Sequence, residues 1–278
     1  MTHQEKVDVL GVSIDPANME QATGAIRHLL EQRQKGFICM VGVHGVMEAQ
    51  RDPDLAAIYD AATLMLPDGM PTVWVGHWQG FGEMRRVTGP DLMIEIFRRP
   101  EFSGVRHYLY GGKAGIAEEL KQSLTRRFPH ARIVGHYTPP FRDLNVQEWE
   151  SFRAEIQRLK PDIIWVGIST PRQEKFMYHA LAGLDTTLMF GVGAAFDYHT
   201  GRIKDAPEWV KTIGMQWLHR LIQDPRRLMA RYLRNNPAFV GKIILQLLRG
   251  TTPEAQRPAV AEQREYKLAV KAVKHSRR

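Results

Sequence analysis

The chain has 278 residues, of which 44% are hydrophobic and 24% charged, and it carries a formal net charge of +8. This composition is typical of a globular protein with a substantial core, and the sequence holds no internal repeat or low-complexity tract. A single cysteine, Cys39, excludes an intrachain disulfide, and its apolar neighbours indicate a place in the core. The N-terminus lacks the basic head and apolar stretch of a signal peptide, so we expect a cytoplasmic protein.

Strand and helix signals alternate along the first two-thirds of the chain. In chain order we predict a strand at 7–14, a helix at 18–33, a strand at 36–43, a helix opening at Asp52 and Pro53, a strand at 63–66, a helix at 91–98, a strand at 105–110, a helix at 113–128, a strand at 132–135, a helix at 146–159, a strand at 162–168, a helix at 171–181 and a strand at 187–190. Several of these strands are apolar throughout, which is typical of a parallel sheet buried on both faces. We therefore expect an α/β fold with helices on both faces of the sheet and ligands at the carboxyl ends of its strands.

The strand signals stop after Gly201, and the chain becomes strongly basic. Three helices are predicted, at 208–223, 225–235 and 237–249. Residues 1–201 carry 21 Lys and Arg against 24 Asp and Glu, whereas residues 202–278 carry 17 against 6. We expect an α/β catalytic core at 1–201, a basic helical appendage at 202–249 and a flexible basic tail at 250–278. A basic end of this kind indicates a polyanionic partner, either nucleic acid or anionic lipid.

The most informative candidate site is Asp68, which follows the short strand at 63–66 and Pro67. In a parallel sheet, a carboxylate at a strand tip lies where ligands bind, and it can act as a general base. The alternative is that Asp68 caps the following helix, with Gly69 supplying the turn. The local pattern alone slightly favours the cap.

Two glycine pairs also follow predicted strands. Gly111 and Gly112 would let backbone N–H groups approach a phosphate, although many tight turns use two glycines for geometry only. Gly191 and Gly193 would let a ribose or a flat ring lie against the backbone, or they serve close helix packing.

A third turn, at 169–174, is polar. Arg172 could clamp a phosphate and Gln173 could hydrogen-bond a base or a sugar. The alternative is an ordinary helix start, in which Glu174 favours the positive end of the helix dipole.

Two features of the sequence bear on metal binding. Asp52 and Asp54 have the Asp-x-Asp form with which many sugar transferases hold a divalent ion, but helix capping explains them better. The histidines show no metal-ligand spacing on a plausible helix, so we expect no structural metal.

Taken together, these sites resemble the WecG/TagA/CpsF family of bacterial glycosyltransferases, from about residue 7 to residue 239. The matching blocks are Gly-Val-His-Gly-Val-Met-Glu-Ala at 42–49, Pro-Asp-Gly-Met-Pro at 67–71, Arg-Val-Thr-Gly-Pro-Asp-Leu at 86–92, Tyr-Gly-Gly at 110–112, Pro-Arg-Gln-Glu at 171–174, Gly-Val-Gly-Ala-Ala-Phe-Asp at 191–197, Ala-Pro-Glu-Trp at 206–209, Trp-Leu-His-Arg-Leu at 217–221 and Pro-Arg-Arg-Leu at 225–228. Each block is short, but their order and spacing together are specific.

The resemblance implies an inverting transfer of a sugar from a UDP-sugar to a polyprenyl-diphosphate-linked saccharide. The product would belong to a teichoic acid linkage, a common antigen or an exopolysaccharide. A Rossmann-like core that requires no metal or other cofactor is implied, with a C-terminal helical appendage that engages the inner face of the membrane. The resemblance also makes Asp68 the proposed base, which favours that role over the cap.

The candidate residues fall into two groups beside Asp68. Donor and substrate binding is assigned to His44, Gly69, Arg86, Gly111, Gly112, Arg172, Gln173, Glu174, Gly191 and Gly193. Binding of the acceptor diphosphate and the membrane is assigned to Arg220, Arg227, Arg231 and Arg234. They would share a face of a continuous helix, but we expect Pro225 to break the helix and to split this stripe in two. No window reaches the ~18 apolar residues of a spanning helix, so we expect peripheral attachment through the amphipathic stretch at 239–249. The alternative is that the apolar side of this stretch packs on the core and the arginines are solvated.

The sequence departs from the family pattern in three places. A threonine or asparagine usual near Val41 is absent, and His44 is the polar group at that strand tip. Asp205 stands where an arginine often precedes the Ala-Pro pair, and Gln216 replaces the usual glutamate before Trp217. The Gly-Val-His-Gly variant is similar to the exopolysaccharide branch. The transferred sugar, the acceptor saccharide and the oligomeric state, a homo-oligomer included, stay open.

Two other function classes compete. A nucleotide-dependent oxidoreductase would need a fuller Gly-x-Gly-x-x-Gly fingerprint, and a nucleic-acid-binding module would need aromatic residues among the arginines. The ordered motifs at the strand tips argue against both, so we expect no nucleic-acid partner.

Overall fold

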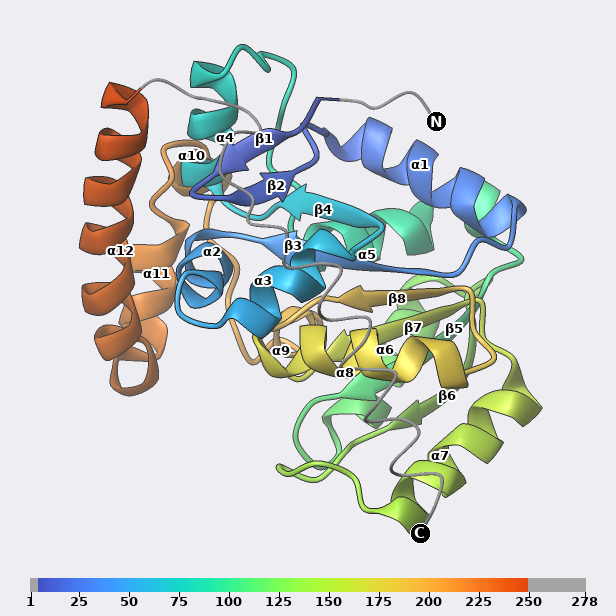
Figure 1. Ribbon diagram of the computed structural model, residues 1–278. Helices are drawn as coiled ribbons and strands as arrows, with labels where there is room; N and C mark the ends of the chain where they lie inside the picture. Colours follow the sequence, from blue (N-terminus) through green and yellow to red (C-terminus); the bar gives the residue numbers. More distant parts are fainter. Residues whose placement is uncertain (1–4, 250–278) are drawn as a thin grey trace, which may run out of the picture.

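The computed structural model describes residues 5–249 and is built around a six-stranded parallel sheet (Figure 1). Its strands lie in the order β4-β3-β8-β7-β5-β6 and cover Leu64–Pro67, Gly36–Val41, Leu188–Gly191, Ile163–Gly167, Arg106–Gly111 and Arg132–Tyr137. Every pairing in this sheet is parallel. The predicted α/β, Rossmann-like fold class is therefore confirmed.

Helices cover both faces of the sheet, because both faces are apolar, as the alternating side chains of β3 show. Phe37 and Cys39 point into one apolar cluster, whereas Ile38 and Met40 point into a second cluster on the opposite face. The helices of the core are α1 (Met19–Glu31), α2 (Val43–Ala49), α3 (Pro53–Asp60), α4 (Met70–Trp78), α5 (Gly89–Arg98), α6 (Ile116–Arg127), α7 (Val146–Leu159), α8 (Arg172–Ala180) and α9 (Ala195–His199), with 3-10 turns at Pro100–Phe102 and Leu181–Gly183. The predicted core position of Cys39 is confirmed, since its side chain is fully buried.

The N-terminal segment differs from the single strand predicted at 7–14. It forms an antiparallel hairpin of β1 (Val7–Val9) and β2 (Val12–Ile14), outside the main sheet. The turn is made by Leu10 and Gly11, whose φ angles of 54° and 82° lie in the left-handed region. The apolar residues on both sides of the turn concealed it in the sequence pattern.

Up to residue 249, where the description ends, three helices follow the core, and their boundaries also differ from the prediction. The helix predicted at 208–223 is interrupted at Gly214, with a φ of 74°, and becomes α10 (Glu208–Thr212) and α11 (Gln216–Gln223). The two helices predicted at 225–249 are one helix, α12 (Pro225–Leu248), with Pro237 inside it. The carbonyl of Leu233 loses its usual donor there, but Leu233 and Pro237 are exposed, so solvent can satisfy it.

Helix α12 is anchored on the core along its second half. Phe239 and Ile243 are 4% exposed and join the core cluster, while Gln246 accepts a hydrogen bond from Leu10 N–H and donates one to Asp8 O. Part of the amphipathic stretch predicted at 239–249 therefore packs on the core, whereas Ile244, Leu247 and Leu248 of the same stretch are exposed. No helix of the described residues is long and apolar enough to cross a bilayer. The tail predicted at 250–278 lies outside the described residues.

Candidate active site

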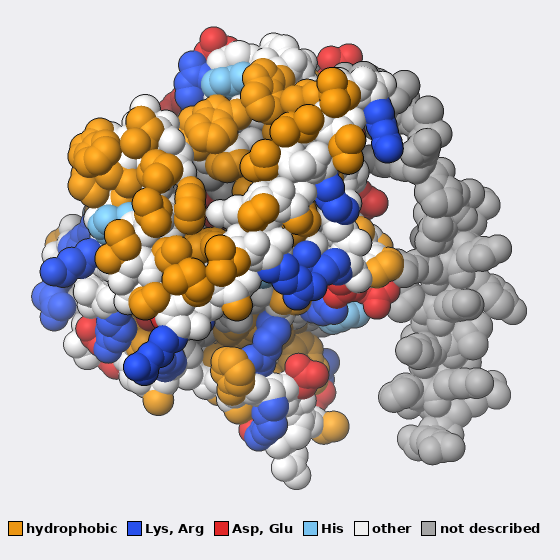
Figure 2. Space-filling model, turned by 90° about the vertical axis from the view of Figure 1, so that its left-hand side faces the viewer, with side chains coloured by type: hydrophobic (Ala, Val, Ile, Leu, Met, Phe, Trp, Pro, Cys, Tyr) orange, Lys and Arg blue, Asp and Glu red, His pale blue; other side chains and the backbone are white. Residues whose placement is uncertain are grey.

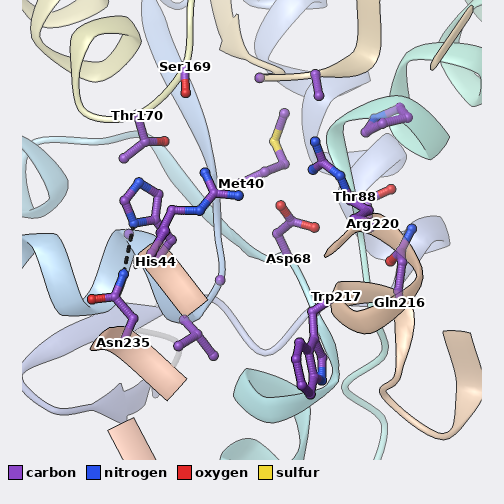
Figure 3. A pocket seen from close by; sticks show the side chains of 18 of the residues that line it. Met40, His44, Asp68, Thr88, Ser169, Thr170, Gln216, Trp217, Arg220 and Asn235 are labelled. Carbon is purple, nitrogen blue, oxygen red and sulfur yellow. Dashed lines mark hydrogen bonds between the residues drawn. The ribbon is translucent and has the colours of Figure 1, made fainter. Parts of the chain in front are cut away.

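A cavity of about 740 Å³ opens at the carboxyl ends of the central strands, between the core and helices α10, α11 and α12 (Figure 3). It brings together most of the residues selected from the sequence: His44, Asp68, Gly69, Arg86, Gly112, Arg172, Gln173, Gly191, Gly193, Arg220, Arg227 and Arg231. Three selected residues do not line it: Gly111, Glu174 and Arg234.

Asp68 lies at the floor of this cavity, directly after β4, between His44 on one side and Arg220 on the other (Figure 3). Its backbone N–H donates to the Val41 carbonyl at 3.0 Å, which ties the tip of β4 to the tip of β3. Gly42 is required beside it, because an added Cβ would lie 2.2 Å from the Asp68 carbonyl oxygen. The side chain is thus presented by two neighbouring strand ends.

The structure does not support the reading of Asp68 as a helix cap. The N-cap of α4 is Gly69, with a φ of 118°, and no side chain caps this helix in the part of the chain described. Burial raises the pKa of Asp68 to about 6, against the opposing effect of the Arg86 and Arg220 cations. A carboxylate of this kind is ionised at neutral pH and is a stronger base than an ordinary aspartate.

Arg86 connects the core to the helices that follow it. One of its terminal nitrogens lies 3.1 Å from the carboxylate of Asp91, and the other donates to the Gln216 side-chain oxygen at 3.1 Å. The Thr88 hydroxyl donates to the same Asp91 oxygen at 2.8 Å. Arg86 is therefore held between a carboxylate of α5 and an amide of α11, where it lines the cavity near Asp68.

His44 makes a second connection of this kind, from a helix that the sequence analysis missed. It lies in the first turn of α2, and its Nδ1 accepts a hydrogen bond from the Asn235 amide of α12 at 3.2 Å. Burial, assisted by the nearby Arg231 cation, lowers the pKa of His44 to about 4. His44 is thus neutral at physiological pH, which leaves Nδ1 free to accept this bond.

The polar turn at 169–174 is divided between the cavity and its support. The Gln173 side chain lines the cavity, accepts from Gly193 N–H at 3.1 Å and donates to Glu174. Glu174 is fully buried and accepts a second bond from the Thr170 hydroxyl at 2.8 Å. Its carboxylate holds the loop after β8 through Gln173, and its side chain does not line the cavity.

The glycine turn at the end of β5 supports the alternative reading, in which the two glycines serve geometry. An added Cβ on Gly111 would lie 2.5 Å from the Gly167 carbonyl oxygen, so this glycine permits the close approach of β5 and β7. The Gly112 N–H donates to that same carbonyl at 3.1 Å, and α6 begins only at Ile116. The Gly112 N–H is thus engaged by the protein rather than directed at a phosphate.

Three of the four selected arginines reach the cavity from the appendage helices. Arg220 of α11 and Arg231 of α12 are half-buried, and the Nε of Arg231 is buried without a hydrogen-bond partner among the described residues. Arg227 lines the cavity from the first turn of α12, whereas Arg234 is exposed outside it. The break predicted at Pro225 is confirmed, since α11 ends at Gln223 and α12 begins at Pro225, so Arg220 lies on a different helix from the other three.

Other cavity residues gave no signal of their own in the sequence. They include Phe141, Tyr198, Lys211 and the tryptophans Trp74 and Trp78. Phe141 is 97% exposed on the rim, with the Arg172 guanidinium 4.9 Å from its ring centre.

The Asp52 and Asp54 pattern is a helix start. The Asp52 carboxylate accepts from Asp54 N–H and Leu55 N–H and pairs with Lys175 at 2.6 Å. The predicted helix-capping role of Asp52 is confirmed. Within residues 5–249, no group of three or more His, Cys, Asp or Glu side chains is arranged to hold a metal ion.

The glycosyl transferase WecG/TagA/CpsF family model matches residues 7–253, which is most of the chain. The chain belongs to this family. Similar proteins include two enzymes named N-acetylglucosaminyldiphosphoundecaprenol N-acetyl-beta-D-mannosaminyltransferase. The one from Bacillus subtilis (strain 168) is 26% identical over 201 residues, which are 72% of this chain and 77% of the relative. The one from Staphylococcus aureus (strain MW2) is 26% identical over 240 residues, 86% of this chain and 92% of the relative.

As a member of the WecG/TagA/CpsF family, the chain is a glycosyltransferase. The resemblance inferred from the ordered motifs is confirmed, and the oxidoreductase and nucleic-acid-binding hypotheses are no longer needed to explain them. The cavity described above is the candidate active site of this glycosyltransferase.

Proposed function

We propose that this protein transfers a sugar from a UDP-sugar to a saccharide carried on a polyprenyl diphosphate, with inversion at the anomeric carbon. The observation that carries the proposal is Asp68, a carboxylate of raised pKa at the floor of the cavity. The names of the relatives specify a diphosphoundecaprenol-linked acceptor, which supports the acceptor class.

Inversion requires a single base, and Asp68 is suited to be that base. Its carboxylate takes the proton of the acceptor hydroxyl while the oxygen attacks the anomeric carbon. The bond from that carbon to the diphosphate breaks on the opposite side, and UDP leaves with the electron pair. Two other carboxylates of the cavity are engaged, since Asp91 pairs with Arg86 and Asp205 pairs with Lys211 at 2.6 Å. Within residues 5–249, Asp68 forms no salt bridge, so its oxygens are available to a substrate.

Both substrates carry a diphosphate, and cationic side chains are placed to neutralise it. Arg220, Arg227 and Arg231 line the side formed by α11 and α12, and Arg172 and Lys113 line the side formed by the core. Guanidinium groups bind phosphate oxygens in pairs and stabilise the charge that develops on a leaving diphosphate. In this account, these side chains take the place of a metal ion, and the enzyme needs no cofactor.

We also place the enzyme at the inner face of the membrane, held peripherally by the side formed by α4, α10, α11 and α12. Figure 2 shows this side, where many hydrophobic side chains are exposed together and Lys and Arg side chains lie near them. Its exposed apolar residues include Trp78, Trp209, Ile222, Leu233 and Leu248. Apolar side chains that enter the interface and basic side chains that meet anionic lipid act together in such attachment.

The test is a nucleotide-release assay over a panel of UDP-sugars, with a short-chain polyprenyl-diphosphate saccharide as acceptor. We expect UDP release only when the correct donor and the acceptor are both present, and we expect the product to have the anomeric configuration opposite to the donor. A product with retained configuration, or no turnover of any UDP-sugar with such acceptors, would overturn the proposal.

A further inference from the structure

The cavity extends well beyond Asp68, into an arm whose lining is apolar. Helix α4 begins next to Asp68 at Gly69 and leads away from it, with the second half of α12 facing the same cavity. The arm is lined by Trp74, Trp78, Ile213, Phe239, Val240 and Ile244. At 1.5 Å per helical residue, the walls extend roughly 12 Å past the catalytic end.

The walls of this arm are fixed at their far end by the N-terminal hairpin. The backbone carbonyl of Asp8 accepts hydrogen bonds from Gln79, which follows α4, at 2.6 Å and from Gln246 of α12 at 2.9 Å. At the near end, the Trp74 ring packs on the turn between α10 and α11, where a Cβ on Gly214 would lie 2.7 Å from it. The arm is therefore a defined feature of the fold rather than a gap between loosely packed helices.

The polarity of the cavity changes in a fixed order along its length. Asp68 lies at the floor, Arg220 and Arg231 lie beside it, and the apolar arm follows along α4 and α12. An acceptor of the proposed kind has the same order, with a sugar hydroxyl, then a diphosphate, then a hydrocarbon chain. The Nε of Arg231 is buried and has no hydrogen-bond partner within residues 5–249. This supports an anion at the junction, because a buried donor without a partner is costly.

We propose that this arm binds the first isoprene units of the acceptor and leads the lipid from the membrane surface to Asp68. The proposal rests on the proposed function and assigns one part of the acceptor to one part of the cavity. Trp78, Val240 and Ile244 are 62%, 55% and 51% exposed in the absence of the acceptor. The hydrocarbon would cover part of this apolar surface, which favours binding.

The chain offers a closely matched pair of residues for the test. Ile244 and Leu245 are neighbours on α12 and are 51% and 52% exposed, but only Ile244 lines the cavity. Replacing either by serine removes a similar apolar area from the same helix. A general effect on membrane contact or on helix stability would change both variants alike.

The experiment measures the acceptor KM for a series with one saccharide diphosphate and tails of zero, two, three, four and eleven isoprene units. It is run without membranes, and acceptors that aggregate are assayed in detergent micelles. For the wild type, we expect KM to fall as the tail lengthens to the first few units and then to level off. The comparison is the ratio of the acceptor KM without a tail to the acceptor KM with a four-unit tail. For Ile244→Ser this ratio should be about tenfold smaller than for the wild type, and for Leu245→Ser it should equal the wild-type ratio.

The outcomes test the lipid arm and the proposed function separately. Transfer that does not depend on tail length, or equal losses in Ile244→Ser and Leu245→Ser, would overturn the lipid arm while leaving the glycosyl transfer intact. No transfer to any member of the series would overturn the proposed function itself. Should Ile244→Ser fail to fold, Val240→Ser gives the same comparison, and the wild-type length series alone still decides.

Discussion

The raised pKa of Asp68 predicts that this residue destabilises the protein at the pH at which the enzyme works. An ordinary aspartate has a pKa of 3.8, whereas burial raises that of Asp68 to about 6. Folding therefore favours the protonated form of Asp68. As pH rises from 3.8 to 6, this residue lowers the free energy of unfolding by a growing amount. Above pH 6, the pKa difference lowers the free energy of unfolding by about 3 kcal/mol. This value is an upper limit, because the side chain is partly open to the cavity.

The perturbation is Asp68→Asn, which keeps the size of the side chain but cannot ionise. Below pH 3.8 Asp68 is protonated, so the substitution removes no charge from the folded protein. Above pH 6 it removes the whole destabilisation that the ionised, buried carboxylate causes. We expect the variant to be more stable than the wild type, with a gain that increases by about 2 kcal/mol between pH 4.5 and pH 8.

The assay is urea unfolding of both proteins over that pH range, with Asp91→Asn as the control. Asp91 is the ion-pair partner of Arg86, so its replacement should give no such gain. A stability difference for Asp68→Asn that is constant with pH, or a loss that grows with pH, would refute the reasoning about burial of this carboxylate.

Three further predictions follow from the site. Activity should survive EDTA, because arginines and lysine face the cavity; a complete loss restored by magnesium or manganese would contradict this. Arg231→Gln should lower kcat/KM by about tenfold to a hundredfold with a fully folded enzyme, since its guanidinium would contact a diphosphate, and an unchanged value would remove Arg231 from the site. The double variant Arg226→Gln, Arg234→Gln, which changes exposed residues outside the cavity, should weaken co-sedimentation with anionic vesicles about 30-fold at low salt; equal binding to neutral vesicles would argue against electrostatic attachment.

Most of the core could be predicted from the sequence because its signals are local. Short apolar runs that alternate with helix signals predict the strands of the parallel sheet, and Asp52 before Pro53 predicts the start of α3. The carboxylate at the tip of β4 was located in the same way, since Pro67 and Gly69 mark the end of one element and the start of the next.

The rest of the site depends on contacts between residues far apart in the chain. His44 and Asn235 are separated by 191 positions, and Arg86 and Gln216 by 130, so no local pattern records either pair. The role of Gly111 depends in the same way on the closeness of β5 and β7. A continuous α12 was also not predicted, because the sequence rule that proline ends a helix ignores the exposed position of Pro237.

The central claim is that Asp68 is the base of the transfer, and the turnover of Asp68→Asn tests it most directly. The measurement is kcat for UDP release with donor and lipid-linked acceptor, on a variant whose urea unfolding shows a folded protein. Loss of a general base predicts a kcat lower by about 100- to 10,000-fold, with the donor KM little changed. A folded Asp68→Asn enzyme with near-normal kcat would contradict the assignment.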